Sequence, residues 1–283
     1  MNNDNRDRPA VKRRQILILG KLLVLIVAGT LYAGQALAPR EDPLKTMVLI
    51  PAGEFLRGSD DADIKQILQL VEGAKTSDYK DEQPKQKISL DAFYIDKYEV
   101  SNAQYQQFLN ATQAPKPSYW DRSNFNKPDY PVVGVNWEEA KAYCEWAKKR
   151  LPTEAEWEKA ARGTDGRLWP WGNNFTPLYA NTHGKEDGYY YTAPVESFPL
   201  GKSPYGVYNM GGNVDEWVAD WYDGNYYKSA PKENPHGPPS GTQKVVRGGS
   251  WLNDPDGSRI ANRTVSEPAS RDSVLGFRCA KSQ

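Results

Sequence analysis

Asn209-Met-Gly-Gly-Asn-Val-Asp-Glu-Trp217 is the stretch of this chain that decides its fold. Three further motifs follow it in order: Val246-Arg-Gly-Gly-Ser-Trp251, Arg259-Ile-Ala-Asn-Arg263 and Gly276-Phe-Arg-Cys279. The whole chain is rich in turn formers and aromatic residues, with 23 Gly, 21 Pro, 9 Trp and 17 Tyr. This composition predicts a domain of turns and irregular loops packed by aromatic rings.

The charge balance argues against one broad class of partner. The 283 residues include 36 basic and 36 acidic side chains, so the formal net charge is zero. Proteins that bind nucleic acids concentrate positive charge on one surface. Here the clustered basic residues are confined to the N-terminus, and we expect no nucleic-acid partner.

The N-terminus has the pattern of a membrane anchor. Residues 1–15 are polar and basic, and residues 16–38 are almost wholly apolar, interrupted by Lys21. About 20 apolar residues cross a bilayer as a helix, and flanking basic residues stay on the cytoplasmic side. We therefore expect a cytoplasmic tail at 1–15, a transmembrane helix at 16–38, a linker at 39–46 and an exported domain at 47–283.

A cleaved signal peptide is the rival interpretation of the same segment. Ala36-Leu-Ala38 has the small-x-small form of a cleavage site. Pro39 in the first mature position and the length of the apolar run argue against cleavage. Both interpretations place the globular domain outside the cytoplasm, in a periplasmic or other extracytoplasmic compartment.

The first half of the domain shows strand patterns around a polar segment. Residues 47–55 read as a strand and turn, and the alternation over 88–96 predicts a half-buried strand. Residues 59–87 are largely polar, so we expect a surface insertion with one short helix at 64–71.

Three helices have clear start signals. Ser101 and Gln104 form a capping box for a helix through Leu109. The other two helices are expected at 137–150, capped by Asn136, and from the capping box at 152–156 to Ala161, closed by Gly163. Beyond Gly163 we expect turns and short strands in one domain without internal repeats.

The four C-terminal motifs, together with Arg150-Leu-Pro-Thr-Glu-Ala-Glu-Trp157, resemble the formylglycine-generating enzyme family, also called the sulfatase-modifying factor family. The matching segments run from Met47 to the C-terminus. The resemblance implies an α+β fold with little regular secondary structure, related to C-type lectins. In this chain the fold would follow one N-terminal transmembrane helix.

The two cysteines of the chain, Cys144 and Cys279, lie far apart in sequence. In an oxidising compartment such a pair favours a disulfide, and two buried thiols are the alternative. The family resemblance implies the disulfide, because its Ala-Tyr-Cys helix pairs with its Gly-Phe-Arg-Cys motif.

The resemblance also implies two structural calcium sites, whose hard oxygen ligands suit that ion. The first consists of Asn209, Gly212, Val214 and Glu216. The second lies in a loop that is shorter than is usual in the family, and consists of Asn181, Thr182, Asp187 and Tyr189. A hydrogen-bonded turn and a solvated loop are the respective alternatives.

The oxidase site of the family is missing its thiols. A soft copper(I) ion needs thiolates, but the positions of the family's cysteine pair align near Asn253 and Ser258. Asp215 stands where the oxidases often have tryptophan. We therefore expect no copper and no formylglycine chemistry.

Other residues of the motif region are candidates for lining a pocket. They are Ser250, Asn253, Arg259 and Arg263. The arginines are alternatively structural, bonding loop carbonyls. The two histidines, His183 and His236, are too few for the three-histidine iron site of other relatives.

Two functions remain open. The first is a binding, accessory or assembly subunit of a membrane or periplasmic complex, with a protein partner and a membrane-anchored, non-oxidase domain. The alternative is a metal-dependent oxidative maturation enzyme with a chemistry other than formylglycine generation. It would use carboxylates such as Asp215, Glu216 or Asp254, but the sequence shows no coherent ligand set. Tyrosine clusters at 189–191 and 222–227 are candidate surfaces for a partner or a glycan, or alternatively belong to the core.

Overall fold

The computed structural model describes residues 46–283. The predicted cytoplasmic tail and transmembrane helix, and the predicted linker apart from its last residue, lie outside this range. No helix within residues 46–283 combines the length and the apolar character that crossing a bilayer requires.

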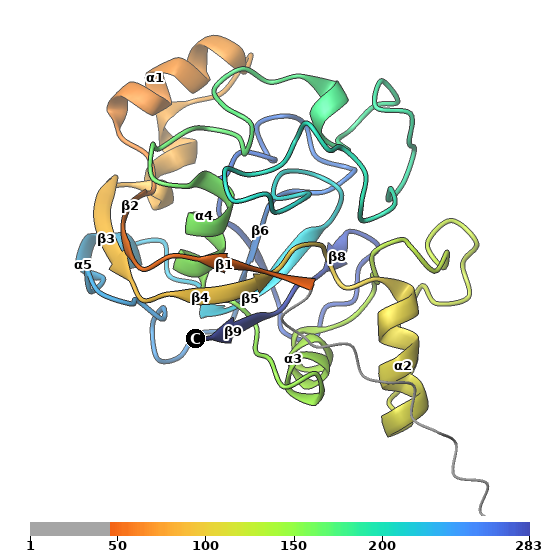
Figure 1. Cartoon of the computed structure of the whole chain (residues 1–283). Coiled ribbons are helices and arrows are strands. Elements are labelled where there is room, and N and C mark those ends of the chain that lie inside the picture. The colour runs from red at the N-terminus through yellow and green to blue at the C-terminus, as the bar shows by residue number, and fades with distance from the viewer. Residues whose placement is uncertain (1–45) are drawn as a thin grey trace, which may run out of the picture. The chain divides into compact units, whose positions relative to one another are not determined.

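Short strands form three small sheets rather than one large one (Figure 1). The first sheet has the order β1-β4-β9, and the second pairs β2 with β3. The strands of these two sheets are β1 (Met47–Ile50), β2 (Gly53–Arg57), β3 (Gln86–Leu90), β4 (Phe93–Asp96) and β9 (Ala280–Ser282). Because β4 pairs with both β1 and β9, the opening strand of the domain and its last strand share one sheet.

The third sheet brings the C-terminal motifs together. Its order is β7-β6-β5-β8, and β5 pairs antiparallel with β6 but parallel with β8. Its strands are β5 (Asp215–Trp221), β6 (Lys244–Arg247), β7 (Thr264–Ser266) and β8 (Leu275–Gly276). Glu216 on β5 therefore lies opposite both Arg247 and Gly276, which belong to two other motifs.

The predicted single strand at 88–96 was wrong in one respect, because the structure divides it into β3 and β4. The interruption is at Asp91, whose backbone N–H donates to Asn234 Oδ1 at 2.8 Å. A loop distant in sequence thus replaces the ladder hydrogen bond at this point, and the two halves pair with different strands.

The helices begin where the capping residues predicted. Ser101, Asn136 and Thr153 each accept a hydrogen bond from the backbone N–H three residues ahead. The helices are α1 (Asp61–Leu70), α2 (Asn102–Thr112), α3 (Trp137–Trp146), α4 (Glu154–Arg162) and α5 (Tyr226–Ser229), with 3₁₀ turns η2 (Thr76–Glu82) and η3 (Pro177–Tyr179).

Helix α3 ends earlier than expected, whereas α4 ends as predicted at Gly163. Lys148 adopts a left-handed conformation with φ of 62°, which stops α3 after Trp146. Arg150 then pairs with Ala280 instead of continuing the helix. Tertiary pairing therefore overrides the helical pattern of the last residues.

Most of the segment 59–87 is exposed or partly exposed, in keeping with its polarity, but a few of its side chains are buried. Ile64 and Ile67 of α1 are buried and pack with Tyr79, Leu168 and Trp169 in a cluster of their own. Glu82 of this segment is also buried and forms an ion pair with Arg259. The segment, called the covering layer below, lies at the edge of the domain (orange in Figure 1) and is attached to it through these buried side chains.

The predicted disulfide is present between Cys144 of α3 and Cys279, with 5.7 Å between the two Cα atoms. Both cysteines are fully buried in a core cluster that also contains Trp217. The bond links α3 covalently to the residue that precedes β9.

Candidate functional site

A buried ion pair lies at the centre of the C-terminal motifs. Arg278 donates from Nε to Glu216 Oε2 at 2.7 Å and from Nη2 to Oε1 at 2.6 Å. Trp157 Nε1 also donates to Glu216 Oε2, at 2.9 Å. Both charged side chains are fully buried, so this bidentate pair replaces hydration with direct hydrogen bonds.

A second buried carboxylate, Glu99, lies beside this ion pair. Its two oxygens accept hydrogen bonds from Asn209 Nδ2 at 2.9 Å and Asn213 Nδ2 at 2.7 Å. Burial raises the pKa of Glu99 to about 7, the nearby Arg278 opposes this shift, and the charge of Glu216 adds to it. Sequence analysis missed Glu99, and the only available signal was an acidic residue beside the apolar Val100.

Asn213 connects Glu99 to two loops. Its side-chain Oδ1 accepts from Ala193 N–H at 2.8 Å and Asn181 Nδ2 at 3.1 Å. Its backbone O accepts from Trp251 N–H at 2.9 Å, while its own N–H donates to Asn181 O at 2.8 Å. Asn213 is fully buried and has a φ of 69°, a left-handed conformation that asparagine tolerates better than most residues.

The first predicted calcium loop supplies oxygen ligands of the right kind, but its glutamate is already neutralised. Arg278 occupies both oxygens of Glu216, and the amide of Asn209 donates to Glu99. Gly212 and Val214 are buried in the turn between them. Calcium at this loop stays a prediction.

The second predicted calcium loop fits the ion better. Asn181 donates through Nδ2 to Tyr191 O at 2.8 Å, while its Oδ1 is buried and has no hydrogen-bond partner within residues 46–283. Asp187 accepts from Thr182 N–H and Tyr189 N–H, and burial raises its pKa. An unpaired oxygen near a half-buried carboxylate matches the needs of a hard cation, and calcium here too stays a prediction.

The Gly-Gly-Ser-Trp motif forms a tight turn. Gly249 has a φ of 70°, and a Cβ atom there would lie 2.6 Å from Gly257 O. Ser250 donates from its backbone N–H to Asn253 Oδ1 at 2.9 Å and from Oγ to the same oxygen at 2.6 Å. Ser250 and Asn253, two of the four residues that were predicted to line a pocket, are thus hydrogen-bonded to each other.

Asp215 lies next to this turn. Burial raises its pKa to about 7, and the nearby Gly249 N–H and Ser250 hydroxyl act in the opposite direction. Its Oδ1 has no partner among the described residues. A buried acid and a serine therefore lie next to each other at this turn.

A groove of about 590 Å³ opens in front of the turn. Its lining residues are His183, Gly184, Lys185, Glu186, Tyr190, Tyr191, Trp251 and Leu252. Tyr190 is 69% exposed, Leu252 57% and Tyr191 40%. The ring of Trp251 packs edge-on against Tyr191 with 5.1 Å between centroids, and its Nε1 donates to Ser273 O at 3.2 Å.

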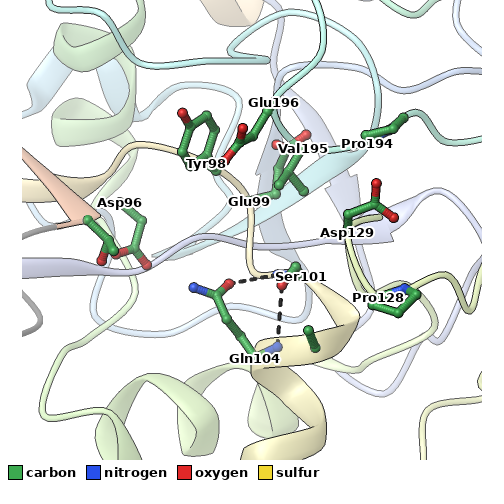
Figure 2. Close-up of a pocket in the computed structure, with 12 residues that line it drawn as sticks. Asp96, Tyr98, Glu99, Ser101, Gln104, Pro128, Asp129, Pro194, Val195 and Glu196 are labelled. Atoms are coloured by element: carbon green, nitrogen blue, oxygen red, sulfur yellow. Dashed lines mark hydrogen bonds between the residues drawn. The ribbon is translucent and has the colours of Figure 1, made fainter. Parts of the chain in front are cut away.

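A second cavity, of about 420 Å³, is lined by Glu99, the partner of Asn213, and is shown in Figure 2. Its acidic lining residues are Asp96, Glu99, Asp129 and Glu196. No lysine or arginine is among the residues that line it. Glu99 therefore lines this cavity. Its partner Asn213 accepts the backbone hydrogen bond from Trp251, which lines the groove.

The two candidate arginines do not join the groove. Arg259 donates from Nη1 and Nη2 to Glu82 at 3.0 and 2.8 Å, and Arg263 donates from Nε and Nη2 to Glu154 at 2.7 and 3.0 Å. Both guanidinium groups are buried, so they hold the covering layer and α4 in place instead of binding a ligand. The structural interpretation of these residues is the one that the geometry supports.

The histidines are surface residues. The side chain of His183 is 64% exposed and lies 3.5 Å from Asp254, measured from Nδ1 to Oδ1, and His236 is exposed in a different loop. Across residues 46–283, no group of three or more His, Cys, Asp or Glu side chains is arranged to hold a metal ion.

Comparison with known proteins defines the class to which this fold and site belong. Residues 34–283 match the model of the sulfatase-modifying factor enzyme 1-like domain. The chain belongs to this family, that of the formylglycine-generating enzymes. The α+β fold with few helices agrees with the expectation from sequence.

Three relatives show the range of the family. The formylglycine-generating enzyme of Bos taurus is 37% identical over 88% of this chain and 79% of its own length. The inactive C-alpha-formylglycine-generating enzyme 2 of Bos taurus is 30% identical over 90% of this chain and 94% of its own. Among solved structures, PvdO from Pseudomonas aeruginosa aligns with a TM-score of 0.70 and 29% identity over 84% of this chain and 94% of its own.

Proposed function

We propose that this chain is a non-oxidase member of its family, anchored in a membrane by residues 16–38. Its exported domain would bind a ligand and serve as an accessory or assembly subunit of a membrane or periplasmic complex. The observation that carries this proposal is the state of its cysteines. The sequence contains two, and both form the disulfide between Cys144 and Cys279. The chain therefore has no thiolate to offer copper(I).

The residues in place of the thiols support the same conclusion. Asn253 is engaged by Ser250, and the buried Ser258 donates from Oγ to Pro255 O at 2.8 Å. These hydrogen bonds stabilise a turn and leave neither side chain as a soft metal ligand. An inactive relative at 30% identity is consistent with a family fold that persists without the oxidase reaction.

The groove supports a binding role. Tyr190, Tyr191 and Leu252 expose apolar surface around one concavity, and clustered exposure of this kind marks interaction sites. The predicted calcium loop at 181–189 leads directly into these tyrosines. We propose that structural calcium there would hold the groove wall in position.

The proposal that the chain is not an oxidase can be tested directly. The purified full chain would be incubated with copper, oxygen and a cysteine-containing sulfatase peptide, with the bovine formylglycine-generating enzyme as positive control. We expect unchanged peptide by mass spectrometry. Aldehyde formation above the level of heat-denatured chain would refute the non-oxidase assignment.

Anchoring and assembly need a separate experiment. The full chain should stay in the membrane fraction after alkaline carbonate washing, whereas a chain without residues 1–38 should be released. Gentle detergent extraction of the full chain should then yield a second subunit in a fixed ratio. A monodisperse chain without partner would contradict the accessory role.

The alternative enzyme function has one observation in its favour. Asp215 is a buried carboxyl with an unpartnered oxygen beside Ser250, directly behind the groove turn. Buried, perturbed acids of this kind recur at catalytic sites. An enzymatic activity of the chain that Asp215→Asn abolishes without lowering its stability would favour this enzyme function over the accessory role.

A further inference from the structure

We propose that the groove formed by the loop 183–191 and by Trp251 and Leu252 binds a neutral saccharide. This inference rests on the proposed function in one respect, namely that the groove is a ligand site. It adds the chemical class of the ligand, which follows from the arrangement of rings, charges and backbone around the groove.

The rings supply a rigid floor and one open stacking surface. Trp251 is held by its hydrogen bond to Ser273 O and by the edge of Tyr191. Tyr191 is itself packed edge-on against Phe125, at 5.3 Å between ring centroids. Tyr190 is the most exposed ring of the groove, at 69%, and no described ring packs against it. The C–H faces of a sugar ring would cover such an amphipathic surface.

The charged residues of the groove cancel each other. Lys185 and Glu186 stand side by side in the loop, and Glu186 Oε2 accepts from the Lys185 backbone N–H at 2.9 Å. The lining therefore has no net charge with which to select an ion. Together with His183 and the tyrosine hydroxyls it nevertheless presents both donors and acceptors, as alternating sugar hydroxyls require.

The backbone around the groove disfavours other polymers. Every lining residue lies in a bend or turn, so the groove offers no strand edge to which an extended peptide would add. A nucleic acid would need an excess of positive charge, which the lining lacks. A lipid chain would need more aliphatic surface than Leu252 alone provides.

The test is a titration of the full chain with neutral oligosaccharides. Cellopentaose, maltopentaose and the pentamer of N-acetylglucosamine are the probes, in a detergent without a sugar head group. Binding is followed by tryptophan fluorescence and by calorimetry. We expect at least one probe to bind, Tyr190→Ala to weaken it about tenfold and Tyr190→Phe to keep it within about twofold, because stacking needs the ring and not its hydroxyl.

Leu178→Ala is the matched control, since Leu178 is 67% exposed but is not among the groove residues. It should leave binding unchanged. Failure of all three probes, or binding that Tyr190→Ala does not weaken, would overturn the inference. Preferential uptake of an unstructured peptide in competition with the probes would do the same.

The same preparation separates this failure from failure of the proposed function. A chain that co-purifies with a membrane partner but binds no oligosaccharide contradicts the saccharide alone. A chain that generates formylglycine contradicts the proposed function, whatever it binds in the groove.

Discussion

Replacing Asn213 with alanine should destabilise the domain strongly, because this one side chain satisfies several buried groups. The substitution removes the 2.7 Å hydrogen bond to the carboxylate of Glu99, and a bond to a charged group is worth about 1.5–3 kcal/mol. It leaves the buried N–H of Ala193 without its acceptor, at a cost of about 1–3 kcal/mol. Alanine at a φ of 69° adds about 1 kcal/mol.

Because these effects overlap, we expect a net loss of about 4–6 kcal/mol in the free energy of unfolding. The loss should grow with pH. The pKa of Glu99 in the folded state, about 7, lies above the ordinary glutamate value of 4.5, so its protonated form is favoured in the folded state. The corresponding stability is present below pH 4.5 and is lost as the pH rises through the folded pKa. Removing a donor raises that pKa further, so the variant should suffer more at pH 8 than at pH 5.

The assay is urea unfolding of the full chain without reductant, followed by far-UV circular dichroism at both pH values. Asn213→Asp is the matched variant, because it keeps the Oδ1 acceptor and the left-handed conformation. It places a second carboxylate against Glu99, so it should be tolerated at pH 5 and fail at pH 8. A loss below about 1 kcal/mol for Asn213→Ala, or equal losses at both pH values, would refute this reasoning.

Three further predictions test the fold around the site. Gly249→Ala should lower the free energy of unfolding in urea by about 2 kcal/mol or more, because the new Cβ would lie 2.6 Å from Gly257 O. Gly73→Ala is the control, since Gly73 has a similar φ of 80° but open space around it, and it should cost only about 1 kcal/mol. Equal costs for the two variants would contradict the close approach at Gly249. Burial raises the pKa of Asp220 to about 8, from an ordinary value of 3.8. The free energy of unfolding of the wild type should therefore fall by up to about 1.4 kcal/mol per pH unit between these two values. Asp220→Asn should flatten this slope, and parallel pH profiles of variant and wild type would count against the prediction. Replacing Cys144 and Cys279 together with alanine should lower stability by about 4–5 kcal/mol, since the bond closes a sequence separation of 135, and an unchanged melting temperature would exclude this contribution.

The parts of the fold that sequence predicts well are those fixed by neighbouring residues. Ser101, Asn136 and Thr153 cap helices through bonds to N–H groups three residues away, so their signal is local. The end of α3 and the break between β3 and β4 depend on Ala280 and Asn234, which are distant in sequence. Local patterns carry no information about such partners, and both boundaries were predicted wrongly.

The same distinction applies to the candidate site. The motif containing Trp251 was recognisable from its glycines, and the exposed tyrosines from their clustering. The ion pair between Arg259 and Glu82 could not be recognised from the sequence, because the two residues are 177 positions apart and the polar segment around Glu82 was predicted to lie at the surface. Glu99 was missed for the same reason, since its asparagine partners lie more than 100 residues away.

The sharing of one sheet by β1 and β9 has a consequence for biogenesis. The strand that completes the first sheet is Ala280–Ser282, which pairs with Phe93–Asp96, far earlier in the sequence. Cys279, which seals the core, precedes it immediately. Contacts so distant in sequence form late, because loop closure must precede them. The domain can therefore close only after this strand has been synthesised, and a chain that stops before Cys279 would lack both the disulfide and the third strand of the first sheet.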